Sequence, residues 1–291
     1  MLINQKMKAI VSNDYGSIQN LHLVTDYIHP CPALALDLDN SKTKNSQIPK
    51  GRLLIKTQAV AIAPGDVRVL SGACKKFQGP PSFPYIPGGD LCGIIVDMDM
   101  DMNKNTNKKT KDSTSTTYNV GDRIAARFTE GPRGALGEYT LVNPQMASQV
   151  PSNLSSSEAA ALASSATIAL CLSKKWNITP QERVVIMGSG GGVGSHLCQL
   201  LRIKGVKCIA AASHDPERMK KEPLLCDYAL DYTEKDVYDL EEWNKVGMPA
   251  VDEKFDTVID LSGGGWLRLL EQRRTSASTS TSTNANANAG P

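Results

Sequence analysis

The sequence lacks a strong excess of either charge. Among its 291 residues, 32 Lys and Arg stand against 30 Asp and Glu, which leaves a formal net charge of +2. Surfaces that bind nucleic acid or anionic membranes usually carry a clear excess of positive charge. The basic run at residues 104–111 is interleaved with Asn and Thr, so we interpret it as a solvated loop. We therefore expect no nucleic-acid partner and no membrane partner.

The sequence also lacks paired cysteine spacings and long apolar runs. Its seven cysteines are scattered, odd in number and never spaced C-x-x-C, which argues against a disulfide framework and a structural zinc site. No run is long enough to span a membrane. The start, MLINQKMKAIV, matches neither a secretory signal nor an Arg- and Ser-rich transit peptide. We expect a soluble, cytoplasmic protein, with an organelle as the open alternative.

The first half of the chain predicts a β-rich domain. From residue 7 to about residue 150, short apolar runs are broken by Pro, Gly and Asp. Two polar segments, residues 37–48 and 97–119, interrupt this pattern and are expected to be insertions. We place this domain at residues 1–154. The candidate strands are Arg52 to Ile62, Cys92 to Met98, Arg123 to Arg127 and Glu138 to Val142.

The pattern changes at Ser155. Either Ser155 or Ser156 is placed to cap a helix that extends through Ala-rich sequence to Lys175. Strand-like and helix-like segments then alternate, which predicts a parallel sheet with helices on its faces. They are VVIMG, SHLCQLLRIKG, VKCIAAA, PERMKKEPLL, YALDY and FDTVIDL. We place this domain at residues 155–272, followed by a low-complexity tail at 273–291 that is too polar to fold.

A glycine-rich turn joins the first strand and helix of this second domain. The apolar run from Arg183 to Met187 leads directly into GSGGGVG at 188–194, and apolar residues at helical spacing follow. In a dinucleotide-binding unit such glycines permit a tight turn, close approach of a pyrophosphate, and close packing of helix on strand. The helix N-terminus then favours the phosphate charge. A flexible loop that binds nothing is the alternative, and the strand–turn–helix–strand context argues against it.

The end of the next strand predicts which cofactor is bound. An acidic side chain at this position accepts hydrogen bonds from the ribose hydroxyls and selects NAD. Here the strand ends in Ser213 and His214, and Asp215 comes slightly late. Ser213 can donate to a 2′-phosphate, and Arg218 can pair with its charge. We therefore favour NADPH, with NADH as the alternative. The competing interpretation of Arg218 is an exposed helix residue without a ligand.

Seven stretches, in order along the chain, resemble the medium-chain dehydrogenase/reductase superfamily. They are MKAIVSNDYG, VAIAPGDVRVLSG, PYIPGGDLCGIIV, GDRIAA, EAAALASSATIAL, GSGGGVG and FDTVIDLSGG. Within that superfamily the chain is similar to the zinc-less quinone oxidoreductase and enoyl-reductase-like branch. The resemblance implies an α/β plus β fold, with a GroES-like β-rich domain followed by a Rossmann-type parallel sheet. It also implies hydride transfer from NAD(P)H to a quinone or to an activated alkene of the enone or enoyl type.

The resemblance also assigns cofactor contacts. It implies that Thr167 lies near the nicotinamide, and that residues from Asp260 to Gly263 contact the ribose after the fourth strand. The residues that the resemblance places at the pyrophosphate are Gly188, Gly191, Gly192, Val193 and Gly194.

The zinc-dependent members of the superfamily differ from this chain at their ligand positions. Where they have a Cys ligand this chain has Ala63, and where they have His-Glu it has Gly89 and Asp90. The resemblance therefore implies no zinc and no other metal. It identifies no catalytic proton donor. Tyr85 and Tyr139 are candidates by elimination only, and a core or interface aromatic suits each of them better.

The last part of the chain departs from the resemblance. The Rossmann sheet of the superfamily has six strands, whereas FDTVIDL is only about the fourth and is followed by the low-complexity tail. We therefore expect an incomplete, C-terminally truncated Rossmann sheet. The alternative function is a catalytically inactive, dinucleotide-binding remnant of such an enzyme. A homodimer is expected only for a full-length form, because the dimer contact of the family lies in the missing part.

Overall fold

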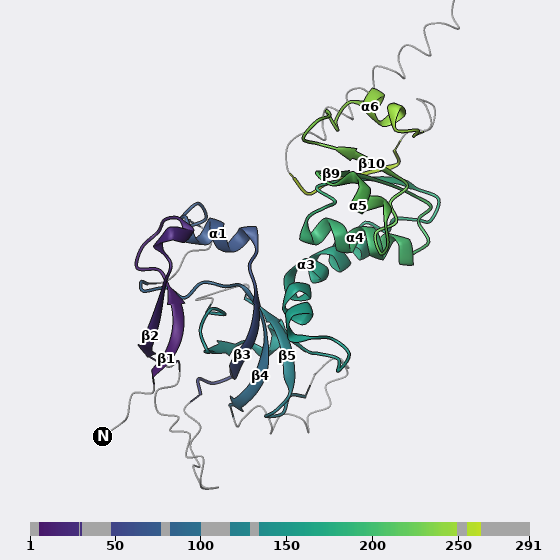
Figure 1. Cartoon of the computed structure of the whole chain (residues 1–291). Coiled ribbons are helices and arrows are strands. Elements are labelled where there is room, and N and C mark those ends of the chain that lie inside the picture. Colours follow the sequence, from purple (N-terminus) through teal and green to yellow (C-terminus); the bar gives the residue numbers. More distant parts are fainter. Residues whose placement is uncertain are drawn as a thin grey trace, which may run out of the picture. The chain divides into compact units, whose positions relative to one another are not determined.

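The computed structural model describes residues 6–28, 30, 48–76, 82–99, 117–128, 134–248 and 255–262. The chain divides into two compact units, residues 1–164 and 165–291, which are described separately (Figure 1). The polar segments at 37–48 and 97–119 fall largely outside the described residues, and the tail at 273–291 falls entirely outside them.

The first unit is built on a five-stranded antiparallel sheet with the order β6-β3-β4-β5-β7. The four predicted strands are confirmed, with small shifts at their ends. Alternate side chains of these strands, such as Leu53 and Ile55, are fully buried in one core together with Leu91 and Ile124. The strands are β3 (Leu53–Ala61), β4 (Asp90–Met98), β5 (Arg123–Arg127), β6 (Tyr139–Val142) and β7 (Ala147–Gln149).

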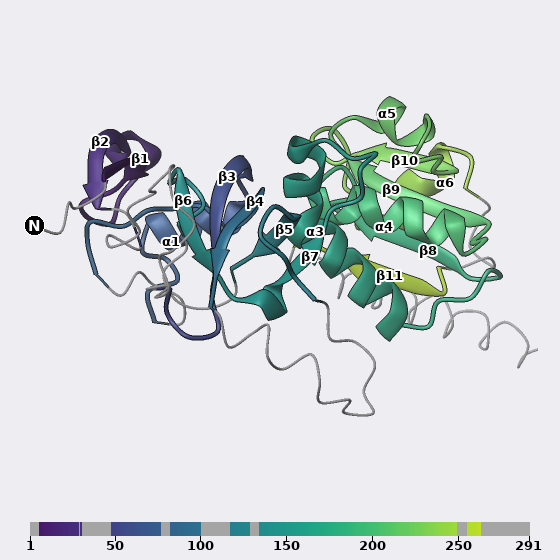
Figure 2. The ribbon, with the colours of Figure 1, turned by 90° about the horizontal axis from the view of Figure 1, so that it is seen from below.

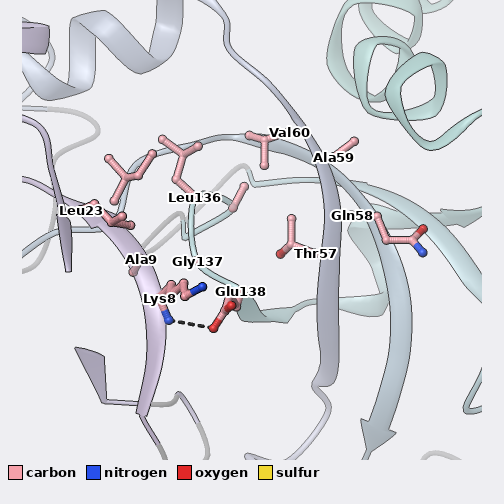
Figure 3. Close-up of a pocket in the computed structure, with 12 residues that line it drawn as sticks. Lys8, Ala9, Leu23, Thr57, Gln58, Ala59, Val60, Leu136, Gly137 and Glu138 are labelled. Carbon is pink, nitrogen blue, oxygen red and sulfur yellow. Dashed lines mark hydrogen bonds between the residues drawn. The ribbon is translucent and has the colours of Figure 1, made fainter. Parts of the chain in front are cut away.

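A second, two-stranded antiparallel sheet of β1 (Lys6–Val11) and β2 (His22–Ile28) lies beside this sheet. Residues 136–138 join the two, because the Glu138 N–H donates to the Lys8 carbonyl at 3.0 Å while the Thr57 N–H donates to the Glu138 carbonyl at 2.9 Å. A pocket of about 290 Å³ opens at this junction (Figure 3). The shorter elements of the unit are η1 (Ile18–Asn20), α1 (Pro64–Leu70) and η3 (Pro144–Met146).

The helix α3 (Ser156–Lys175) begins in the first unit and continues past residue 164. The Glu158 N–H donates to Ser155 Oγ at 3.2 Å, and the Ser155 N–H donates to Glu158 Oε2 at 2.8 Å. This reciprocal pair is a capping box, which satisfies two backbone N–H groups at the helix start. The predicted helix and its Ser155 cap are confirmed. Among the described residues, no helix is long and apolar enough to cross a membrane.

The second unit is built on a four-stranded sheet with the order β10-β9-β8-β11, and every pair of neighbouring strands is parallel. This confirms the predicted parallel sheet. The strands are β8 (Arg183–Met187), β9 (Cys208–Ser213), β10 (Tyr228–Asp231) and β11 (Thr257–Asp260). The helices that follow α3 are α4 (Gly192–Ile203), α5 (Pro216–Lys220) and α6 (Leu240–Lys245).

Helices cover both faces of this sheet, as the alternation of strands and helices predicts (Figure 2). Val184 and Ile186 of β8 pack in one core with Leu197 of α4. Val185, the residue between them, packs in a separate core with Trp243 of α6. Successive side chains of a strand point to opposite faces, so β8 contributes to both cores. A strand buried on both sides has no polar face, which explains the continuous apolar run at 184–187.

One predicted element is shorter than expected. The helix-like segment PERMKKEPLL forms only α5, which ends at Lys220, and Lys221 is extended. Pro223 explains the early end, because proline disfavours helical backbone at the preceding residue and has no N–H to donate. Leu225 then adopts a φ of +47°, which turns the chain into β10.

Candidate functional site

The glycine turn lies between β8 and α4, at the carboxyl edge of the parallel sheet. Gly188 has a φ of +77°, in the region that side-chain-bearing residues avoid. Gly191 is the N-cap of α4 and offers no side chain to cap it. The first N–H groups of α4, on Gly192, Val193 and Gly194, have no acceptor within the helix. Together with the helix dipole they form an arrangement that can hold a phosphate group.

The turn is packed tightly against its own backbone at Gly194. A Cβ on residue 194 would overlap the Gly188 carbonyl oxygen and stand 2.6 Å from the Ser189 Cα. Both are backbone atoms and cannot move aside without opening the turn. Ser189 is itself fixed, because its N–H and its hydroxyl both donate to the Ala212 carbonyl, at 3.1 Å and 2.8 Å. The close packing of helix on strand therefore requires glycine at position 194.

Gly190, a residue absent from the predicted contacts, is also crowded, in this case by a side chain. A Cβ on it would stand 2.5 Å from the Ser213 Oγ. Gly191 differs, since a Cβ there would meet only the Gly188 carbonyl, at 3.4 Å, and Gly191 and Gly192 are both exposed. Crowding on the protein side at 190 and 194, with an exposed backbone at 191 and 192, fits a turn that a pyrophosphate approaches from outside.

The end of β9 holds Ser213, which is buried, with 1% of its surface exposed. Its Oγ accepts a hydrogen bond from the Asp215 N–H at 3.2 Å. The Asp215 carboxylate in turn accepts from the Arg218 N–H at 3.0 Å and caps α5. The acidic residue that comes slightly late in the sequence therefore serves as a helix cap. The Arg218 side chain is exposed on the short helix that follows.

Two aromatic residues that we did not predict lie next to this strand end. Asp231 of β10 is in register with Ser213 of β9, so Tyr232 and His214 follow at the same edge of the sheet. Their rings meet edge to face, with centroids 6.3 Å apart, and Tyr232 is 50% exposed. The signal for Tyr232 is its place directly after a predicted strand of the parallel sheet, where ligands of such sheets bind.

Asp260 lies at the end of β11, beside the glycine turn. Its carboxylate accepts hydrogen bonds from the N–H and the hydroxyl of Ser262, at 2.9 Å and 2.8 Å. The Leu261 N–H donates to the Met187 carbonyl at 3.1 Å, and Leu261 Cβ stands 3.5 Å from where a Cβ on Gly188 would lie. The structure thus brings the β11 end and the turn together. Gly263 lies outside the described residues.

Thr167 lies on α3, which passes the glycine turn. The α3 side chain nearest to Gly192 is Ser165, whose Cβ stands 3.3 Å from where a Cβ on Gly192 would lie. Thr167 is two residues further along the helix, and it is exposed. The structure therefore places the helix beside the turn, and it adds Ser165 to the residues that face it.

The candidate proton donors and the zinc-ligand positions belong to the first unit. Tyr85 is buried, and Tyr139 packs against a small core that includes Met7. Ala63 is the N-cap of α1, and its N–H donates to the buried Asp66 carboxylate at 2.8 Å. The described residues contain no group of three or more His, Cys, Asp and Glu side chains placed to hold a metal ion.

The N-terminal part of the chain matches a known family model. Residues 49–152 match the alcohol dehydrogenase GroES-like domain. A 2-methylene-furan-3-one reductase of Solanum lycopersicum is 30% identical over 266 residues, which are 90% of this chain and 59% of that protein. The chain is thus similar to the quinone oxidoreductase-like branch of the medium-chain dehydrogenase/reductase superfamily.

Further relatives show similar extents of likeness. An NADPH-dependent alkenal/one oxidoreductase of Arabidopsis thaliana is 26% identical, over 90% of this chain and 58% of that protein. The solved quinone oxidoreductase of Coxiella burnetii shares the fold, with a TM-score of 0.65 and 22% identity over 89% of this chain and 70% of that one. This chain thus spans less than two thirds of the curated relatives named here.

Proposed function

We propose that this protein is an NADPH-dependent, zinc-independent oxidoreductase that transfers a hydride to a quinone or to the activated alkene of an enone. The observation that carries the proposal is the open N-terminus of α4 at Gly191 to Gly194, where the backbone is exposed on one side and crowded on the other. The names of the relatives support the reaction, since they are reductases of quinones, alkenals and a methylene-furanone.

The residues of the second unit act in this proposal by binding and orienting the cofactor. The N–H groups of Gly192, Val193 and Gly194 hold the pyrophosphate, and Asp260 and Thr167 fix the ribose and nicotinamide ends. When bound, NADPH supplies the hydride, so the protein contributes orientation and exclusion of water rather than an acid–base machine. We propose Ser165 as a further residue on the turn side of α3, because it faces Gly192.

The preference for NADPH rests on the edge where β9 and β10 end. The two carboxylates at this edge are engaged within the chain, since the Asp215 side chain caps α5 and the Asp231 side chain accepts from the N–H and the hydroxyl of Thr233. The exposed Arg218 guanidinium and the exposed Tyr232 hydroxyl instead offer donors to a 2′-phosphate. One solved structure of the same fold, a mycobacterial protein with a TM-score of 0.67, is a complex with NADPH. This supports NADPH over NADH.

Zinc independence rests on the side chains at the ligand positions of the zinc-dependent members. The Ala63 side chain has no atom that can bind a metal. Gly89 stands where the zinc-dependent members have His, and the buried Asp90 stands where they have Glu. Zinc sites in such enzymes require thiolate or imidazole ligands. We therefore propose that no Lewis acid assists the reaction in this chain. Supplementing the purified protein with zinc is then expected to leave NADPH turnover unchanged.

Two measurements on the purified chain test the proposal in sequence. Titration with NADPH, followed by its fluorescence, is expected to show saturable binding that is tighter than for NADH. NADPH consumption is then followed with a quinone and separately with an enone. Binding without turnover of either substrate would overturn the reductase and favour the inactive remnant, whereas no binding would overturn the cofactor site itself. No relative named above favours the inactive remnant, since each is named for an activity.

The compartment stays a prediction. A cytoplasmic protein is expected from the sequence, but relatives include a chloroplastic protein of Arabidopsis thaliana and a mitochondrial protein of Danio rerio. Microscopy of the fluorescently tagged full-length protein in its own cell type distinguishes these compartments.

A further inference from the structure

We propose that Cys198 and Cys226 form a redox modification site, in which a hydroperoxide converts the two thiols into a disulfide that links α4 to the segment before β10. Neither residue takes part in the proposed cofactor site. Both lie in the core on the α4 face of the sheet, with 0% and 4% of their surfaces exposed. The proposal is independent of the proposed function, because it concerns chain chemistry that needs no NADPH.

Arg202 fixes α4 against the segment that carries Cys226. Its Nε donates to the Leu225 carbonyl at 2.8 Å, and its Nη2 donates to the Asp227 carboxylate at 2.6 Å. These two acceptors are the residues on either side of Cys226. The Asp227 carboxylate also accepts from the Ile209 N–H at 2.7 Å, which ties the same segment to β9. The position of Cys226 relative to α4 is therefore set by a network of charge-assisted hydrogen bonds.

Cys198 precedes Arg202 by four residues, so the two side chains leave α4 on the same face, one turn apart. While Arg202 binds the neighbours of Cys226, Cys198 lies in the same buried core as Cys226, and each thiol shifts the pKa of the other. The Cys226 Sγ also lies 3.9 Å from the Leu224 carbonyl oxygen. Two thiols in one core, on elements that Arg202 joins one turn away, are placed for a direct S–S bond.

The two thiols are not equivalent. The hydrogen bond from Cys198 lowers the pKa of the Cys226 thiol, and the nearby Arg202 charge lowers it as well. The same hydrogen bond, together with burial, raises the pKa of Cys198. Since the thiolate is the nucleophile, Cys226 is the residue that reacts first and Cys198 is the one that resolves.

Cys226 lies just below the surface of the loop that follows α5. The flanking residues Leu225 and Asp227 are exposed, and Leu225 has a φ of +47°. A non-glycine residue in that region stores strain, so local opening of this loop releases it. Opening of this loop exposes Cys226 when the Arg202 bonds to Leu225 and Asp227 also break, while Cys198 stays on the helix beneath it.

The chemistry balances with hydrogen peroxide as the oxidant. The Cys226 thiolate attacks one peroxide oxygen, the O–O bond breaks, and a sulfenic acid and a hydroxide form. The hydroxide takes up the proton that the Cys226 thiol released, which gives one water. The Cys198 sulfur then attacks the Cys226 sulfur, the S–O bond breaks, and a second water leaves with the Cys198 proton. Two thiols lose two electrons in total, and the peroxide is reduced to two waters.

The test is cysteine mapping of the whole chain with and without hydrogen peroxide. The protein is treated, denatured, alkylated and digested, and the peptides are identified by mass spectrometry. We expect loss of two of the seven alkylatable thiols, a cross-linked peptide pair that contains Cys198 and Cys226, and full recovery after reduction. Both thiols still alkylated, a cross-link through another cysteine, or Cys226 oxidised to sulfinic acid with Cys198 free would each overturn the proposal.

Matched variants sharpen this result. Cys208→Ser, at a half-buried thiol on the neighbouring strand, and Cys171→Ser, at an exposed thiol on α3, are expected to leave the cross-link intact. Cys198→Ser is expected to abolish it and to leave Cys226 as a sulfenic acid that a dimedone probe traps. If Cys198→Ser does not fold, the mapping of the unaltered chain still decides the question, because it needs no variant.

Discussion

Gly190 of the glycine turn and Ser213 at the end of β9 are in direct contact, so that a Cβ on residue 190 would stand only 2.5 Å from the Ser213 Oγ. A side chain at position 190 would therefore have to displace a hydroxyl on the next strand, and the two positions are coupled. The strand end and the glycine turn, which the sequence separates by more than twenty residues, form one packed unit.

This contact predicts a rescue. Gly190→Ala is expected to destabilise the chain by about 1–3 kcal/mol, because the added methyl overpacks a buried site. Ser213→Ala removes the opposing oxygen and leaves the Ser213 Cβ position 3.5 Å away, which is ordinary contact. The double variant is therefore expected to regain most of the loss, a positive coupling of about 1 kcal/mol or more. Urea unfolding of the four proteins measures it. Additive effects would contradict the contact.

Gly191 and Gly194 are expected to separate cofactor binding from folding. Gly191→Ala meets only an ordinary contact in the free protein, but it adds a methyl to the exposed face of the turn. We expect near-normal unfolding and a dissociation constant for NADPH raised by about tenfold or more, which corresponds to ~1.4 kcal/mol. Gly194→Ala overlaps backbone atoms and is expected to impair stability as well. Equal stability losses in the two variants would show that the exposed face is not the binding face.

Arg218 is expected to discriminate between NADPH and NADH. Arg218→Ala removes an exposed charge from the edge of the sheet where the 2′-phosphate is proposed to bind. Exposed ion pairs contribute about 1 kcal/mol or less, so the NADPH dissociation constant is expected to rise by roughly fivefold. The value for NADH is expected to stay the same. Lys220→Ala, on the same short helix, is the control. A similar change for both cofactors, or for both variants, would remove Arg218 from the phosphate contact.

The sequence was sufficient to predict the features that depend on neighbours along the chain. The strands of both units, the Ser155 cap and the glycine turn each rest on side-chain pattern or on spacing within a few residues. The helix after Asp215 is shorter than its composition predicts, because Pro223 disfavours helical backbone before it.

The features that sequence reasoning missed depend on the register of the parallel sheet. Tyr232 lies beside His214 only because Asp231 is paired with Ser213, and the need for glycine at 190 arises from the same strand end. Likewise, Asp215 in the sequence looks like a displaced cofactor ligand, and only the helix geometry shows it as a cap. No pattern within one segment contains these contacts, since each joins residues from different strands.

A hydrogen bond to a carboxylate attaches β11 to the residue before β8, which makes this attachment sensitive to pH. The Thr257 hydroxyl donates to Glu182 Oε2 at 2.6 Å, and the Thr179 N–H donates to Oε1 at 2.9 Å. The Thr257 bond is the main reason that the pKa of Glu182 lies below its usual 4.5. A depressed folded-state pKa adds stability above the unfolded-state value, and this is lost as the pH falls through the folded-state value.

Thr257→Val is therefore expected to be less stable than the unaltered chain at neutral pH. The difference between their free energies of unfolding, here called the gap, is expected to narrow on acidification below pH 4.5. The Glu182→Gln variant has no titrating group at this position. The difference in the free energy of unfolding between this variant and the double variant Glu182→Gln with Thr257→Val is therefore expected to stay constant over the same pH range. Urea midpoints at a series of pH values measure both gaps. A Thr257→Val gap that does not change with pH would mean that the hydroxyl does not favour the charged form of Glu182, and the bond would then act only as a neutral link between β11 and the residue before β8.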